Sequence, residues 1–207
     1  MKTINPSGRL SVMFIMFSLF FILSGILQAQ DKGTYIDKRD NHAYKFEKIG
    51  KQVWMTQNLA FATPAGSGYY NNNDTIGKKI GRLYDWNTAS KACPKGWHMP
   101  SDVEWTSLIK ELGGEDAAGG KFQEFDTIAK DPTAKKPELT GGFSSLLGGV
   151  RHGDNTFTGI SFWGGLWSST ATAEEASNYL FVKNGKTLGK STATKNTGYY
   201  VRCIRSK

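Results

Sequence analysis

The stretch CPKGWHMPSDVEW, residues 93–105, contains the clearest structural signal in the chain. Ser101 followed three residues later by Glu104 is a capping box, in which each side chain satisfies a backbone amide at the start of a helix. The apolar residues that follow recur at the spacing of one helix face. They are Trp105, Leu108, Ile109 and Leu112, and Gly113 with Gly114 supplies a stop. We therefore expect a helix that begins after the Ser101 cap and ends near residue 112.

Before this stretch the sequence predicts strands. Residues 44–49 alternate apolar and polar side chains, as a half-buried strand does, and residues 52–55 return after a Gly-Lys turn. This pattern predicts a β-hairpin, with residues 34–36 as an additional strand. Residues 63–81 are rich in Gly, Asn and Tyr and are expected to form a loop.

Residues 83–92 (LYDWNTASKA) carry apolar side chains three to four positions apart. This spacing predicts a short helix that places Trp86 in the core and stops before Pro94.

After residue 113 the signals are shorter. The sequence predicts a short helix at 121–125, short strands with tight turns within 142–170, and strands at 177–183 and 199–204. Asn184-Gly185 is the favoured type I′ hairpin turn. A few short helices among many short strands predict an α+β fold.

The N-terminus has the order of a secretory signal peptide. Lys2 and Arg9 precede an apolar run from Leu10 to Leu27, and the small Ala29 follows. We expect residues 1–29 to be cleaved and residues 30–207 to form one domain with no membrane span; an uncleaved N-terminal anchor is the alternative. The protein is then exported, and the periplasm, the outer surface and the extracellular medium all stay open as its location.

The charge distribution bears on the class of partner. Removing Lys2 and Arg9 lowers the formal net charge from +8 to +6, and the remaining basic residues are scattered. Proteins that bind nucleic acid usually gather this charge in a stripe or patch, so we expect no nucleic-acid partner. A weak affinity for acidic polymers stays open.

Cys93 and Cys203 are the only cysteines. In an oxidising compartment two thiols of one domain usually pair, so we expect a disulfide that closes a loop of about 110 residues; two buried free thiols are the alternative. The chain has no CxxC motif and no Cys/His cluster, so we expect no metal site.

Known catalytic motifs are missing. His42, His98 and His152 are far apart in sequence, no local motif offers them a nucleophile or a carboxylate, and His98 is expected to be structural. The chain contains neither a phosphate-binding loop nor a Gly-x-Ser-x-Gly elbow. We therefore expect a protein that is not an enzyme and has no cofactor.

Aromatic residues next to amides are the best functional hint. Two groups are the candidate ligand-binding residues: Tyr69, Tyr70, Asn71, Asn72 and Asp74 in the predicted loop, and Trp163 with Trp167 in a Gly-rich segment. Flat rings beside amide and carboxylate groups suit sugars, and rings also dominate protein interfaces. Trp163 and Trp167 filling the core is the favoured alternative for that pair.

Several separated motifs resemble the Fibrobacter succinogenes major paralogous domain. They are IGKQVWM at 49–55 with Asn58-Leu59, LYDWNTA at 83–89, residues 93–105, Gly142-Phe143, GGVR at 148–151 and Val201-Arg202-Cys203. The resemblance runs from about Thr34 to the C-terminus and departs at Leu147, where proline is expected. It implies an exported or surface protein of Bacteroidetes or Fibrobacteres, in a family without an established activity.

The motif order also resembles the C-type lectin-like fold, including formylglycine-generating enzymes. Met99–Trp105 and Tyr200-Val201-Arg202 are the counterparts of that fold's recurring helix start and closing strand. The resemblance implies a scaffold of short helices packed on short antiparallel strands, with long irregular loops. The closely spaced reactive cysteines of those enzymes and the calcium-binding motifs of the lectins are missing from the sequence. An incidental cation site among residues 71–74 stays open.

The sequence thus predicts an exported, non-enzymatic binding or structural module of the cell envelope. Its partner would be a surface glycan or another envelope protein. An enzyme on a scaffold like that of the formylglycine-generating enzymes is the alternative.

Overall fold

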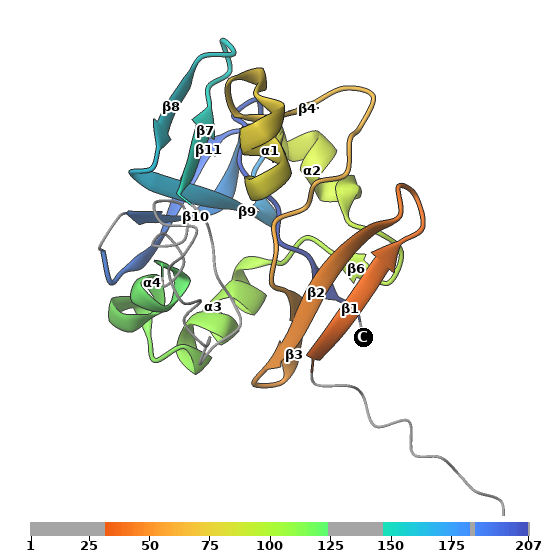
Figure 1. Ribbon diagram of the computed structural model, residues 1–207. Helices are drawn as coiled ribbons and strands as arrows, with labels where there is room; N and C mark the ends of the chain where they lie inside the picture. Colours follow the sequence, from red (N-terminus) through yellow and green to blue (C-terminus); the bar gives the residue numbers. More distant parts are fainter. Residues whose placement is uncertain (1–31, 124–146, 183–184, 207) are drawn as a thin grey trace, which may run out of the picture.

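A computed structural model describes residues 32–123, 147–182 and 185–206 (Figure 1). Within these ranges the chain is a mixed α+β protein with curled, mainly antiparallel sheets and short helices. The predicted signal peptide at 1–29, the Gly142-Phe143 motif and Asn184 of the predicted turn lie outside the described residues.

The first sheet joins the two ends of the described chain in the strand order β1-β2-β3-β12-β6. The predicted hairpin is confirmed, because β2 pairs antiparallel with β3 across a turn at Gly50, whose φ is 58°. The strands are β1 (Lys32–Asp37), β2 (His42–Ile49), β3 (Gln52–Met55), β6 (Trp97–His98) and β12 (Ile204–Arg205). Chain segments from both ends of the sequence therefore share one sheet.

The second sheet occupies the opposite side of the molecule (Figure 1) in the order β11-β10-β9-β7-β8. Its strands are β7 (Gly148–Arg151), β8 (Phe157–Ile160), β9 (Trp163–Ala171), β10 (Glu175–Val182) and β11 (Leu188–Thr194). The pairing is antiparallel except where β7 meets β9. The predicted strand at 177–183 corresponds to β10, and the return strand starts at Leu188.

Helix α3 (Asp102–Glu111) connects the two sheets. Its predicted capping box is present, with Ser101 as N-cap and Glu104 bonding back to the cap. The Trp105 ring, fully buried, lies 5.0 Å from the Trp54 ring of β3 and 4.9 Å from the Tyr179 ring of β10, measured between centroids. The apolar helix face that the spacing predicted is present, and through Trp105 it packs against both sheets.

Four predicted elements need correction. The predicted loop 63–81 contains β4 (Ser67–Gly68), a 3₁₀ turn at Tyr70–Asn72 and α1 (Asp74–Ile80). The predicted helix 83–92 is strand β5 (Leu83–Tyr84) followed by α2 (Trp86–Ala92), because the Asp85 side chain accepts a hydrogen bond from the Thr88 amide and starts the helix there. Trp86 is half-buried and packs at the edge of the core.

The other two corrections concern where α4 begins and how much of the last predicted strand is paired. The predicted helix 121–125 is α4 (Glu115–Gln123), which begins six residues earlier, after Gly114 turns the chain with a φ of 91°. The predicted strand 199–204 reduces to β12, because Tyr199 and Tyr200 form only single bridges to Tyr84 and Leu166.

The predicted disulfide between Cys93 and Cys203 is present. It ties the residue that ends α2 to the residue just before β12, and the two lie 110 positions apart in sequence. Cys203 is fully buried, so the bond belongs to the core beside the first sheet.

Candidate functional site

Tyr69 and Tyr70, which were predicted to bind a ligand, pack their rings against other side chains of the protein. Tyr70 is buried, and its ring packs 5.2 Å from that of Phe157 in β8. Tyr69 is half-buried, and the Arg82 guanidinium lies 4.2 Å from the centre of its ring. A guanidinium over an aromatic face is a favourable cation–π contact, which covers the surface that a sugar would need.

The polar residues of the same loop have local structural roles. Asn71 and Asn72 are exposed, with left-handed φ values of 51° and 53° that asparagine tolerates well. The Asn73 side chain caps α1 by accepting from the Ile76 amide at 3.1 Å, and Asp74 sits in the first turn, where a negative charge is favoured. Among the described residues no group of three His, Cys, Asp or Glu side chains could hold a metal ion.

The two tryptophans of the second candidate group differ in exposure. Trp167 is fully buried, its ring Nε1 donates to the Tyr84 carbonyl at 2.7 Å, and the structure therefore places it in the core. Trp163 is half-buried and lies directly opposite Val182, which is 54% exposed. Its neighbour Phe162 is 70% exposed. Trp163 therefore stays near the surface, while its ring and that of Trp167 pack against the same Tyr199 ring, at 6.4 and 4.8 Å between centroids.

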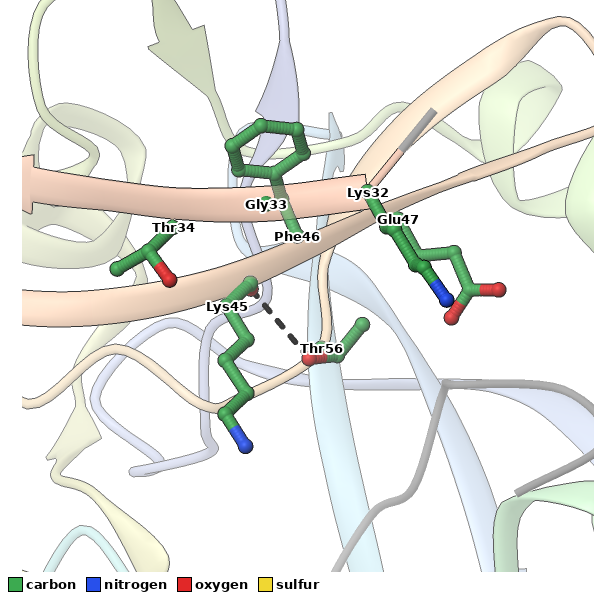
Figure 2. A pocket seen from close by; sticks show the side chains of 7 residues that line it. All are labelled: Lys32, Gly33, Thr34, Lys45, Phe46, Glu47 and Thr56. Atoms are coloured by element: carbon green, nitrogen blue, oxygen red, sulfur yellow. Dashed lines mark hydrogen bonds between the residues drawn. The ribbon is translucent and has the colours of Figure 1, made fainter. Parts of the chain in front are cut away.

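A cleft that the sequence did not reveal lies on the β1–β2 ribbon (Figure 2). Its volume is about 440 Å³, which falls within the range of small-molecule sites. The strand register forms it: Lys32 pairs with Glu47 and Thr34 pairs with Lys45, so these four side chains share one face of the ribbon. The lining residues are Lys32, Gly33, Thr34, Lys45, Phe46, Glu47 and Thr56.

The chain that follows β3 fixes one wall of the cleft. Both the amide and the hydroxyl of Thr56 donate to the Lys45 carbonyl, at 2.9 and 3.4 Å. The Lys45 amide in turn donates to the Gln57 side-chain oxygen at 2.8 Å. These bonds use the backbone of Lys45 and leave its ammonium group directed away from the ribbon, as Figure 2 shows.

The strand period explains which polar side chains line the cleft. Phe46 points to the opposite face, where its ring packs 5.9 Å from that of Trp97 and under the Arg205 guanidinium at 4.4 Å. Its neighbours Lys45 and Glu47 therefore face the cleft. Within the described part of the chain, neither Lys32 nor Lys45 has an ion-pair partner. The cleft thus offers two ammonium groups, two hydroxyls and one carboxylate.

His98 has a carboxylate partner that its sequence context did not reveal. Its Nε2 lies 2.9 Å from Glu104 Oε1 and its Nδ1 lies 3.0 Å from Ser206 Oγ. The other oxygen of Glu104 accepts from the Ser101 amide at 2.8 Å and closes the capping box. Burial disfavours the charged carboxylate, but the bonds from Ser101 and His98 outweigh it and lower the pKa of Glu104.

The remaining histidines contact neither each other nor this group. The His42 ring packs 4.5 Å from that of Tyr44, and His152 Nε2 lies 2.8 Å from Thr158 Oγ1. The three histidines therefore lie in separate places, as their sequence positions suggested. The contact between His98 and Glu104 holds the start of α3 against the first sheet.

Comparison with known proteins places the chain in a family. The model of the Fibrobacter succinogenes major domain matches residues 48–205. The chain belongs to this family. The major-domain match covers both cysteines, α3 and the second sheet, and begins at residue 48, later than the Thr34 suggested by the motifs.

Most residues of the cleft lie outside the stretch that matches the family model. Lys32, Thr34, Lys45 and Glu47 all precede residue 48, and only Thr56 of the cleft lies within the matched major domain. The cleft therefore combines a segment outside the family match with one residue inside it. A search of the curated proteins and a search of the solved structures each found no significant match.

Among the described residues, no helix is long and apolar enough to cross a membrane.

Proposed function

We propose that this protein is an exported, non-enzymatic binding module of the cell envelope and that it binds a glycan in the β1–β2 cleft. The observation that carries the proposal is the cleft itself, which gathers charged groups and hydroxyls from three segments in a concave site of about 440 Å³. Concave sites with a few convergent polar groups are the usual form of ligand-binding sites.

The lining favours a saccharide over an apolar protein side chain. The Thr34 and Thr56 hydroxyls, the two ammonium groups and the Glu47 carboxylate can donate to and accept from sugar hydroxyls. The one large apolar residue of the lining, Phe46, turns its ring to the other face of the sheet. No aromatic or aliphatic side chain of the size that anchors a protein interface therefore faces the cleft from its lining residues.

The non-enzymatic part of the proposal draws support from the cysteines. Formylglycine-type chemistry needs reactive thiols, and Cys93 and Cys203 are joined to each other, so the alternative, an enzyme on that scaffold, would need a different active site. The finer assignment of the scaffold as C-type lectin-like is part of the same proposal; the short capped helix between two sheets of short strands supports it. Export through a cleaved signal peptide is the last part of the proposal. Sequencing the N-terminus of the protein recovered outside the cytoplasm checks it.

A glycan array probed with the exported protein tests binding. Thr34→Val removes one cleft hydroxyl with little change in shape, and losing one hydrogen bond of about 1 kcal/mol should weaken binding about fivefold. Thr75→Val, at an exposed position of α1, is the matched control and should bind like the unaltered protein. The proposal fails when no glycan binds, or when the two variants bind alike.

A further inference from the structure

The cleft carries an unbalanced positive charge at a defined position. Lys32 lies directly opposite Glu47, and Figure 2 shows the two side chains next to each other, so a ligand anion at Lys32 would also meet the Glu47 carboxylate. Lys45 lies opposite Thr34, a neutral residue, and has no ion-pair partner among the described residues. Of the two ammonium groups, that of Lys45 is therefore the better placed for a ligand anion.

A hydroxyl donor lies beside this cation. The Thr34 side chain shares its face of the ribbon, whereas the Thr56 hydroxyl already donates to the Lys45 carbonyl and is left as an acceptor. Figure 2 shows the side chains of Thr34 and Lys45 toward one end of the cleft and those of Lys32 and Glu47 toward the other, with Thr56 between them. An ammonium group beside hydroxyls is a suitable site for a single carboxylate, since hydrogen bonds assisted by charge are stronger than neutral ones.

We propose that the cleft selects a saccharide that carries a carboxylate, with the carboxylate at Lys45 and sugar hydroxyls at Glu47. This inference rests on the proposed function and adds the chemical class of the glycan. The excess of basic residues, +6 once Lys2 and Arg9 are removed, also favours an acidic ligand through long-range attraction.

The Glu47 carboxylate disfavours a ligand that presents only negative charges to the cleft. A polyanion whose side chains end only in carboxylates would place one of its charges beside this carboxylate, and like charges at close range disfavour binding. A uronic-acid oligosaccharide also carries hydroxyls on every unit, and a hydroxyl can donate to Glu47 while a carboxylate lies at Lys45. The cleft should therefore prefer uronic-acid oligosaccharides to a dense polyanion.

Titration calorimetry with three probes tests the inference. The probes are a tetramer of galacturonic acid, its neutral methyl ester and an oligoglutamate of equal charge. We expect the exported protein to bind the acid tetramer about tenfold more tightly than its ester or the oligoglutamate, and Lys45→Gln to remove this preference. Lys78→Gln, at an exposed position of α1, is the matched control and should keep it.

The outcomes separate the two proposals. Equal binding of the tetramer and its ester, with Lys45→Gln without effect, overturns the inference but leaves glycan binding in place. Oligoglutamate bound as tightly as the tetramer also overturns it, because the site then recognises charge without sugar. Loss of the preference in Lys78→Gln as well assigns it to general charge and overturns it too. Failure of every glycan to bind would refute the proposed function itself.

Discussion

His98 Nε2 lies 2.9 Å from Glu104 Oε1, so one carboxylate serves both the start of α3 and strand β6. The second oxygen of Glu104 accepts from the amide and the hydroxyl of Ser101, at 2.8 and 2.9 Å. Because α3 packs on both sheets through Trp105, the position of its first turn matters to the whole core. Glu104 therefore connects a local helix cap to the tertiary structure.

Replacing Glu104 should cost more stability than replacing the cap residue alone. Ser101→Ala removes the capping hydroxyl and should lower the free energy of unfolding by about 1 kcal/mol. Glu104→Ala removes the return bond of the capping box and also the contact with His98, so its loss should exceed that of Ser101→Ala. Urea denaturation of both variants measures the difference. Equal losses would show that the His98 contact contributes nothing.

Stability should fall in acid, and Glu104 should account for part of the fall. Burial disfavours its charged form, but hydrogen bonds from Ser101 and His98 outweigh this and lower its pKa below the ordinary value of 4.5. For a group with a lowered folded pKa, the stabilisation is present above the unfolded pKa and is lost as the pH falls through the folded pKa. Asp102 behaves in the same way, because Lys190, Ser168 and Ser177 outweigh the effect of its burial.

The melting temperature between pH 7 and pH 3 measures this dependence. It should fall below about pH 4.5, where protons begin to compete for these carboxylates. Glu104→Gln cannot titrate at this position and should flatten the curve over the same interval. An acid response identical to that of the unaltered protein would contradict the assignment to Glu104.

The disulfide should contribute several kcal/mol. Cys93 and Cys203 close a loop of 110 residues, for which the chain-entropy model gives about 4.7 kcal/mol. Denaturation with and without reductant should show a loss of that order, and the double variant Cys93→Ser/Cys203→Ser should not respond to reductant. A protein equally stable in both conditions would mean that the bond does not constrain the unfolded chain.

The elements that the sequence predicted correctly are those formed by residues close together in the chain. The Ser101 cap, the face of α3 and the hairpin at 44–55 depend on neighbours within a few positions, and all three are confirmed. Helix α1 was missed because its sequence, DTIGKKI, has no repeating apolar face, and it forms where Asn73 caps it and where Gly77 makes room for the Tyr69 ring.

The candidate site was missed for a different reason. The cleft depends on the register that places Thr34 opposite Lys45, and on Thr56 bonding to the Lys45 carbonyl, which no single segment encodes. The contact between His98 and Ser206 joins residues 108 positions apart. Aromatic residues next to amides predicted a surface site at Tyr70, but its ring is buried because a fold of short elements needs large side chains to fill its core. Trp167 is buried for the same reason, as the favoured alternative for that residue predicted.

Two adjacent glycines of α4 should respond oppositely to the same substitution. A Cβ atom at Gly119 would lie 2.3 Å from the Thr187 carbonyl oxygen, so Gly119→Ala must push α4 away from the segment that leads into β11. Overpacking of this kind costs about 1–3 kcal/mol. A Cβ atom at Gly120 meets nothing within 4 Å, and there alanine should raise the stability by about 0.5–1 kcal/mol, because glycine is the poorer helix former. Urea denaturation measures both variants, and each serves as the control for the other. A stabilising Gly119→Ala would show that α4 does not rest on Thr187.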